Sequence, residues 1–248
     1  MVRVQGNERV RAQQRFRHVI SLGYFCSTAL ELQRYGLRDG SYPFDWNIST
    51  IRPTLAMVES GFGGFLERDR LYRDAAHPGI IRDTGSGINL YNDFDPALSI
   101  EEQYEVVRKK YSRRIQRFQR ATTEPTLFVR YMLDFDEFAY LDANMSDVMA
   151  LLRRTNPQND LLLVGNADLP TTCGGLKVYA VAVDDGDVVA RKFMRKNAQL
   201  SRRLLGLNYP LGLRLRNLLK HWLPLQRLRK YLRLGTRLRN VRRQPSAQ

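Results

Sequence analysis

HVISLGYFCSTALELQRYGLRDGSYPFDW, residues 18–46, decides the fold because it places a cysteine between a strand and a helix. Residues 18–22 are β-branched and apolar and predict a strand, which Gly23 ends. Cys26 then opens a segment in which apolar residues recur at helical spacing, namely Ala29, Leu30, Leu32 and Tyr35. The sequence therefore predicts a strand–turn–helix unit with Cys26 at the start of the helix.

A thiol in this position is a candidate nucleophile. The first turn of a helix presents unpaired backbone N–H groups and the positive end of the dipole, and both favour the thiolate. The same N–H groups can hold the oxyanion that forms when the thiolate attacks a carbonyl. We therefore expect a depressed pKa and a reactive thiol at Cys26, but not at Cys173, which precedes Gly174-Gly175 in a loop. The structural alternative is that Cys26 is a small apolar residue at a tight turn.

A wider set of residues carries a resemblance to a known family. The set comprises Ser21-Leu22-Gly23, Cys26, Ala29, Leu32, Gly36-Leu37-Arg38, Tyr42-Pro43-Phe44-Asp45-Trp46, Lys110-Tyr111, Arg113-Arg114, Arg117-Phe118 and Leu127-Phe128-Val129-Arg130. It resembles a bacterial family described as papain-like cysteine peptidases, the domain of unknown function 1796 family, over about residues 17 to 170. The resemblance implies a papain-like fold, in which the helix that bears the nucleophile packs against a sheet, and an acyl or peptide substrate.

A papain-type mechanism also requires a histidine downstream of the cysteine, to take the thiol proton and return it to the leaving group. The chain has three histidines. His18 precedes Cys26 on the predicted strand, and His221 lies in the basic C-terminal segment. His77 is therefore the candidate general base. The alternative is an exposed histidine in a turn, because residues 75–79 (AAHPG) have turn composition.

The resemblance also indicates a problem with the base. The family pattern has a His-Asp-Phe element, and the corresponding residues here are Asn92-Asp93-Phe94. Asparagine cannot accept a proton at neutral pH, so the catalytic pair is either broken or rebuilt from His77. Asp45 and Asp93 are candidates for orienting an imidazole. For Asp45 the alternative role is to tie a turn through backbone N–H groups.

Composition limits the other classes of site. At 248 residues, 43% of them hydrophobic, the chain can bury one sizeable core. Its two cysteines suit neither a disulfide framework nor a zinc site, and no glycine-rich phosphate-binding motif is present, so we expect no metal and no cofactor. The first 17 residues are basic and polar rather than a secretory signal, and no run of 18 apolar residues occurs. These features favour the cytoplasm.

The positive charge is concentrated at the C-terminus. Residues 201–248 contain 13 Lys or Arg and no Asp or Glu, so they carry +13 of the net charge of +15 and leave +2 over residues 1–200. Apolar residues recur there at helical spacing, namely Leu211, Leu215, Leu218, Trp222, Leu225, Leu228 and Leu232. A basic amphipathic helix suits the surface of an anionic membrane, which we expect residues 201–243 to bind at its inner face. The alternatives are docking of the leucines on the protein itself and, less favoured because few aromatic residues are interleaved, binding of nucleic acid.

The remaining sequence alternates helices and strands. The patterns predict helices over residues 52–67, 99–120 and 145–154 and strands over residues 87–91, 126–131, 161–164 and 176–183. Ser99 and Glu102 have the spacing of a capping box. We therefore predict an α/β or α+β domain over residues 18–200, between a basic polar segment (1–17) and the basic tail (201–248). A papain-like arrangement and a doubly wound sheet with Cys26 at the carboxyl end of a strand both remain open, and both place the site at the same residue.

Two classes of function also remain open. The first is an enzyme that uses the Cys26 thiolate for acyl transfer, to water or to another acceptor. The second is a non-catalytic relative that keeps the fold for binding, at a membrane where surface polysaccharide or envelope material is assembled. The retained cysteine favours the first class, and the missing family histidine favours the second.

Overall fold

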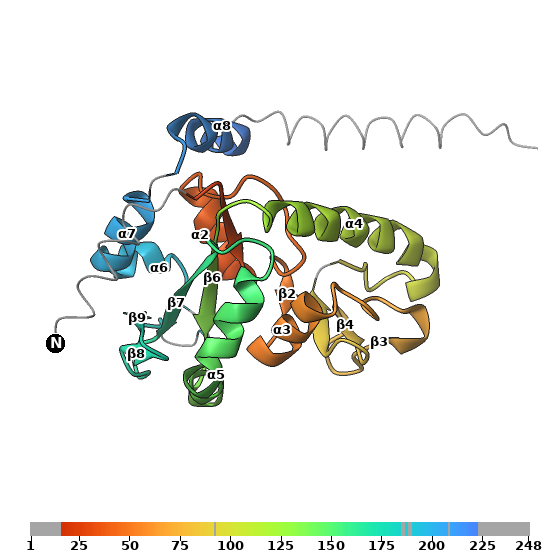
Figure 1. Ribbon diagram of the computed structural model, residues 1–248. Helices are drawn as coiled ribbons and strands as arrows, with labels where there is room; N and C mark the ends of the chain where they lie inside the picture. The colour runs from red at the N-terminus through yellow and green to blue at the C-terminus, as the bar shows by residue number, and fades with distance from the viewer. Residues whose placement is uncertain (1–15, 92, 185–186, 188–189, 208, 223–248) are drawn as a thin grey trace, which may run out of the picture.

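Five strands form the central sheet, as the computed structural model in Figure 1 shows; it describes residues 16–91, 93–184, 187, 190–207 and 209–222. The strands are β1 (His18–Ser21), β6 (Thr126–Met132), β7 (Asp160–Asn166), β9 (Leu176–Val181) and β8 (Thr172–Cys173), in the order β1-β6-β7-β9-β8. The first four are parallel, and β8 pairs antiparallel with β9 at the edge. The carboxyl ends of the parallel strands therefore lie at one edge of the sheet, where open α/β sheets place their sites.

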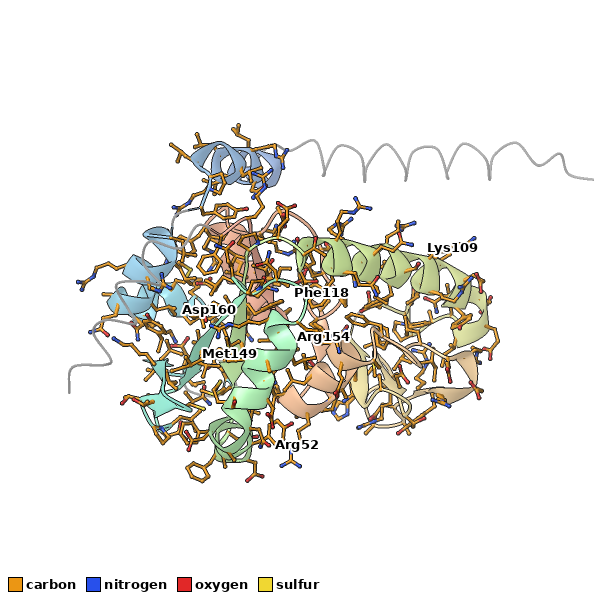
Figure 2. All side chains as sticks on the ribbon, viewed as in Figure 1. Arg52, Lys109, Phe118, Met149, Arg154 and Asp160 are labelled. Atoms are coloured by element: carbon orange, nitrogen blue, oxygen red, sulfur yellow. The ribbon has the colours of Figure 1, made fainter. Side chains whose placement is uncertain are left out.

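Helices cover both faces of this sheet, so the fold has three layers. On one face pack α2 (Cys26–Arg34), α6 (Phe193–Lys196) and α7 (Ala198–Leu205), and on the other α3 (Ile51–Glu59), α4 (Ile100–Ala121) and α5 (Phe135–Arg153). Neighbouring strand residues point to opposite faces: Val19 and Val129 belong to the core on the α2 side, and Ile20 and Phe128 to the core on the α5 side. Phe118 of α4 and Met149 of α5, labelled in Figure 2, are part of the second core.

A smaller antiparallel sheet is inserted between β1 and β6. Its strands are β2 (Asn47–Ile48), β5 (Ile88–Tyr91), β4 (Ile80–Asp83) and β3 (Leu71–Arg73), in the order β2-β5-β4-β3, and the 3₁₀ turn η1 (Arg68–Arg70) precedes β3. The N-terminal part of α4 covers this sheet, because Ile100, Val107 and Tyr111 pack with Ile81 and Leu90. The insertion places β2 and β5 beside the turn that leads into α2, through a bridge between Tyr24 and Ser49.

The prediction of an α/β or α+β domain is confirmed at the level of class, as a mostly parallel sheet with helices on both faces. The Ser99 capping box is present at the start of α4. Helix α5 is longer than predicted, since Asp134 caps its true start by accepting from the Glu137 N–H. Helix α3 ends at Glu59, near Gly61 at φ +63°, and is shorter than predicted.

The C-terminal part of the described chain is folded onto the sheet. Helix α7 runs across position 200, so a domain boundary there would divide a helix, and its Leu200 and Leu204 are completely buried. Helix α8 (Leu211–Trp222) follows and lies at the edge of the molecule beyond α2 (Figure 1). Of the leucines on the predicted stripe, Leu218 faces Gly36 of the protein itself, whereas Leu211 and Leu215 are exposed. Most of the predicted N-terminal segment 1–17 and residues 223–248 lie outside the described residues.

Candidate functional site

The turn before Cys26 is built as the sequence predicted. Helix α2 begins at Cys26, directly beyond the carboxyl end of β1, and Phe25 at its N-cap supplies no side-chain hydrogen bond to the first turn. Gly23 has φ +83°, and a Cβ atom there would lie 2.8 Å from Ser49 Oγ, so only glycine fits. Phe25 therefore leaves the backbone N–H groups of the first turn of α2 without a cap from its own side chain.

A buried arginine holds this turn in place. Arg130 of β6 is completely buried, and its guanidinium donates to Leu22 O at 2.7 Å, to Ser49 O at 2.9 Å and to Glu137 Oε1 at 2.5 Å. One side chain thus joins the end of β1, the segment after β2 and the start of α5. The role of Arg130 was not predicted, although a charged residue in the middle of an apolar strand, LFVRYM, is a signal of such a role.

Cys26 lines a cavity of about 650 Å³. The apolar part of its wall consists of Tyr24, Phe25, Leu30, Ile48 and Tyr91, and the polar part of Ser27, Glu31, Arg34, Asp187, Arg191 and Lys192. The wall therefore combines α2, the turn before it, the small sheet and the segment before α6. This volume lies in the range of small-molecule sites, and so does a mostly apolar wall with a few polar groups.

The charged groups of the cavity wall are mostly paired. Glu31 is buried, forms an ion pair with Arg34 and accepts the Met194 N–H at 3.2 Å. Arg191 Nη2 lies 3.0 Å from Asp187 Oδ1. Three cations and two carboxylates therefore line the cavity, with Lys192 as the excess positive charge.

The expectation of a depressed pKa at Cys26 is wrong. Partial burial raises the pKa of this thiol, and a hydrogen bond to its own backbone N–H and the positive charge of Arg191 offset the rise only in part. Burial also raises the pKa of Cys173, to about 12, and that thiol is completely enclosed. Cys26 is partly exposed to the cavity and is therefore the more accessible of the two thiols, but it is no preformed thiolate.

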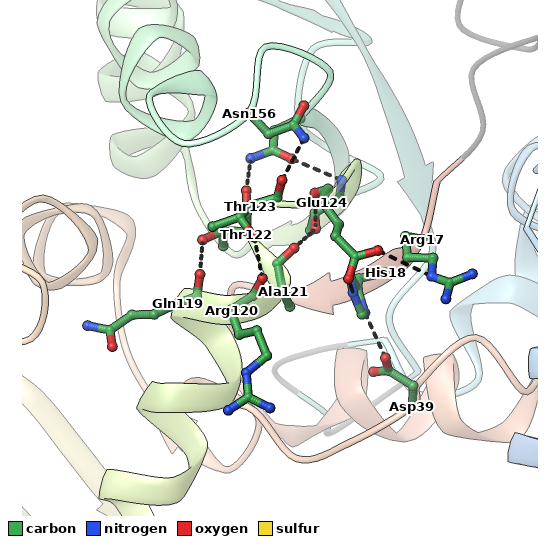
Figure 3. Close-up of polar contacts among 12 residues, drawn as sticks. Arg17, His18, Asp39, Gln119, Arg120, Ala121, Thr122, Thr123, Glu124 and Asn156 are labelled. Atoms are coloured by element: carbon green, nitrogen blue, oxygen red, sulfur yellow. Dashed lines mark hydrogen bonds and ion pairs between the residues drawn. The ribbon is translucent and has the colours of Figure 1, made fainter.

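The structure does not bring His77 to the cavity. Its side chain is 71% exposed, it lies in the turn between β3 and β4, and its Nδ1 atom is 3.6 Å from Asp74 Oδ1. His18 lies at the amino end of β1, opposite to Cys26, where it contacts Asp39 and Glu124 (Figure 3). No histidine lines the described wall of the cavity.

Asp45 and Asp93, the candidates for orienting an imidazole, contact other side chains instead. Asp45 is buried, accepts the Tyr42 N–H at 2.8 Å and pairs with Arg38 at 2.6 Å, so it ties the turn before β2. Neither of these contacts involves an imidazole.

Asp93 is held against α4 instead. It accepts the Tyr111 hydroxyl at 2.5 Å and forms an ion pair with Lys110, and Tyr111 lies 2.6 Å from Asn47 Oδ1. Asn92, the position that corresponds to the family histidine, lies outside the described residues; its neighbour Tyr91 lines the cavity.

Metal ligands are not grouped in the part of the chain that the structure describes, where no three His, Cys, Asp or Glu side chains are placed to hold an ion. Among the described residues, the cavity brings together one thiol, the N-terminus of a helix and three cations of the wall.

Comparisons with known proteins found one similar protein and one matching family. An uncharacterised protein of Acanthamoeba polyphaga mimivirus is 29% identical over 119 residues, which cover 40% of this chain and 53% of that protein. The chain thus matches about half the length of that relative. No solved structure matches it. A family model covers residues 17–164, from before β1 into β7, and this span includes Cys26 and most of the cavity wall. The chain therefore belongs to the family described as putative papain-like cysteine peptidases, domain of unknown function 1796.

Proposed function

We propose that the chain binds, in the cavity at Cys26, a small ligand that joins an apolar body to an anionic group. The observation that carries this proposal is the composition of the wall. Aromatic and aliphatic side chains provide most of its surface, Lys192 supplies an excess positive charge next to Arg191 in sequence, and no described imidazole is present. Without an imidazole, a papain-type proton transfer has no base in this wall.

The polar side of the cavity supports an anionic group. Arg191 and Lys192 follow each other in sequence and both reach the wall that Cys26 shares. The first turn of α2, whose Cys26 and Ser27 line the same cavity, adds the positive end of a helix dipole. The Oγ atom of Ser27, in this turn, is buried and has no hydrogen-bond partner among the described residues.

Octanoate and octanol are suitable probes because they differ in charge and share an apolar chain. Each is tested for its ability to slow the alkylation of Cys26 in a Cys173→Ser protein. Octanoate is expected to protect at a concentration about tenfold lower than octanol, since the excess positive charge of Lys192, next to Arg191, favours a carboxylate over a hydroxyl. In Arg191→Gln/Lys192→Gln the difference should disappear. Equal protection in the wild-type cavity would overturn the anionic preference, and no protection would overturn binding there.

Acyl transfer by Cys26 is the second candidate function. It is favoured by the position of the thiol at an uncapped helix N-terminus inside a cavity. In such a step the sulfur forms a bond to the acyl carbon, the bond to the leaving group breaks, and the thiol proton departs with the leaving group. Water then attacks the thioester, which releases the acid and returns a proton to sulfur.

Hydrolysis of p-nitrophenyl octanoate distinguishes the two functions. A binding protein should show no turnover that Cys26→Ser removes, and intact-mass measurement should show no acyl group on Cys26. A burst of p-nitrophenol and a stable or transient acyl mass that Cys26→Ser abolishes and Cys173→Ser retains would establish acyl transfer instead.

A further inference from the structure

Helix α8 is anchored to the body of the protein by one face only. Leu213 packs against the core on the α2 side of the sheet, and Asn217 is buried and donates to Gly36 O at 3.2 Å. Arg214 donates to Tyr35 O at 3.1 Å. These contacts fix the rotation of α8 about its axis, so its opposite face has a defined direction.

That opposite face carries three exposed leucines. Leu211, Leu215 and Leu219 are 69%, 52% and 58% exposed and follow one another at four-residue spacing. We call these residues the outer leucine stripe. Leu218, which the sequence pattern placed with Leu211 and Leu215, instead faces inward against Gly36. Four-residue spacing places the three leucines on one side of the helix, where they expose a continuous apolar strip.

Exposed arginines occur on the two C-terminal helices α7 and α8. Arg216 is exposed next to Leu215 in the sequence, and Arg202 is exposed on the neighbouring helix α7. The sequence contains no Asp or Glu after Asp187, so no acidic residue lies on α7 or α8. An apolar strip on a helix that carries arginines and no carboxylate matches the headgroup region of an acidic bilayer, where anionic groups lie above apolar acyl chains.

We propose that the outer leucine stripe docks α8, parallel to the surface, on an anionic membrane. The leucines enter the boundary between headgroups and acyl chains, and the exposed arginines contact the lipid phosphates and carboxylates. No helix in the described ranges is long and apolar enough to cross a bilayer. Two other partners for the outer leucine stripe, a second copy of the chain and nucleic acid, are less suitable. A second copy would bring two strongly cationic segments together, and nucleic acid would leave the leucines in water.

Vesicle co-sedimentation of the full-length protein tests this proposal. Binding is measured on phosphatidylcholine vesicles with and without phosphatidylserine, at several salt concentrations. The wild type is expected to prefer the anionic vesicles and to bind less as salt rises. Leu211→Ser/Leu215→Ser/Leu219→Ser should bind about tenfold more weakly or less, because most of the buried apolar area is lost. Arg216→Gln should weaken binding about fivefold.

Matched control variants distinguish docking through the outer leucine stripe from the general effect of removing an exposed apolar or cationic side chain. Leu98→Ser/Val106→Ser removes equally exposed apolar side chains far from α8 in sequence, and Arg113→Gln removes an exposed cation of α4; both should bind as the wild type does. Unchanged melting temperatures show that the variants fold. Wild type that ignores anionic vesicles at low salt, or a leucine variant that binds them equally well, would overturn the proposal. So would a wild-type dimer that the leucine variant converts to a monomer.

Insertion has its own optical signature. In a Trp222→Phe background, used for both tryptophan variants, a tryptophan introduced as Leu215→Trp should shift its emission to shorter wavelength when anionic vesicles are added and should be quenched by brominated lipid. Val106→Trp provides the control and should show neither change. Shifts of equal size at both positions would indicate adsorption without a preferred face and would contradict docking through the stripe.

Discussion

Arg130 illustrates how a single buried residue positions the site. A guanidinium in a dry interior is stable only when its N–H groups are satisfied, and here two backbone carbonyls and one carboxylate accept them. Two of these acceptors, Leu22 and Ser49, flank the turn that carries Gly23. The charge therefore fixes the path of the backbone into α2 and, through it, the direction of the Cys26 thiol.

Loss of this anchor should be strongly destabilising. Arg130→Met leaves the Glu137 carboxylate buried without its cation and two carbonyls without donors, so we expect the free energy of unfolding to fall by about 3–5 kcal/mol. Urea denaturation measures the change. Arg113→Met, at an exposed position of α4, is the matched control and should stay within about 0.5 kcal/mol of wild type. A loss at Arg130 no larger than that of the control would show that the ion pair contributes little.

The thiols of Cys26 and Cys173 should differ in the rate at which they are alkylated and in the pH at which that rate is half-maximal. In Cys173→Ser the remaining Cys26 is expected to react with iodoacetamide along a pH profile whose midpoint lies above the ordinary thiol value of 9.0, because burial raises its pKa. Arg191→Gln should move this midpoint further up, since it removes a positive charge that favours the thiolate.

Cys173 supplies the comparison. In Cys26→Ser the remaining thiol should react far more slowly at every pH below 9, because it is enclosed and its pKa is raised to about 12. Both proteins in urea should react at the same rate. A Cys26 midpoint at or below that of a free thiol would mean that the helix N-terminus outweighs burial.

At the scale of elements, the helices and strands that local sequence patterns determine were predicted correctly. The strand–turn–helix unit around Cys26, the capping box of α4 and the buried strands β6, β7 and β9 all follow from short-range periodicity and caps. The start of α5 was missed because its exposed Phe135 and kink at Asn144 blur the helical pattern. The pairing of Asp45 with Arg38, and of Asp93 with α4, depends on contacts that spacing alone does not reveal.

The cavity was beyond prediction for a similar reason. Its wall combines Ile48 and Tyr91 of the small sheet with Arg191 and Lys192, which are more than 150 residues downstream of Cys26. Only the tertiary fold brings these segments together. The pKa of Cys26 was misjudged because a helix N-terminus was weighed without the burial that accompanies it.

At the amino end of β1, His18 contacts two carboxylates from other parts of the chain, and the strength of these contacts depends on pH. His18 Nδ1 lies 2.7 Å from Asp39 Oδ2, and its Nε2 lies 3.6 Å from Glu124 beyond the end of α4 (Figure 3). Burial lowers the pKa of His18, but the hydrogen bonds and negative charges of Asp39 and Glu124 outweigh it and raise the pKa above the ordinary 6.5. Protonated His18 therefore stabilises the fold.

The sign of the pH dependence follows from this raised pKa. Below pH 6.5 the His18 imidazole is charged in both the folded and the unfolded chain and Asp39 is ionised, so the stabilisation is fully present. It is lost as pH rises through the pKa that His18 has in the folded protein. The difference in unfolding free energy between wild type and His18→Gln should accordingly be larger at pH 5.5 than at pH 9. His77→Gln, at an exposed turn, should show little change over the same range. A difference that grows with pH would contradict a raised pKa.

At the scale of the whole molecule, the point where the sequence becomes strongly basic is not the point where the packed core ends. The charge pattern changes near residue 200, whereas the packing continues through α7, Leu207, Tyr209 and Leu213, which belong to the core on the α2 side of the sheet. The basic C-terminal region therefore begins inside the folded body. A docking surface on α8 is for this reason rigidly tied to the helix that carries Cys26, since α8 contacts the C-terminal end of α2.

Adjacent leucines in α7 test whether this region belongs to the fold. Leu204 is completely buried, and its neighbour Leu205 is 39% exposed, so the two positions share a helix and differ in environment. Leu204→Ala should lower the free energy of unfolding by about 2–5 kcal/mol, because it removes buried methyl groups and leaves a cavity between α7 and the sheet. Leu205→Ala should change it by less than about 0.5 kcal/mol. Urea denaturation followed by circular dichroism measures both. If α7 were an appendage rather than part of the core, the two variants would unfold at the same urea concentration as the wild type, and the continuous packing from the sheet through α7 to α8 would not contribute to stability.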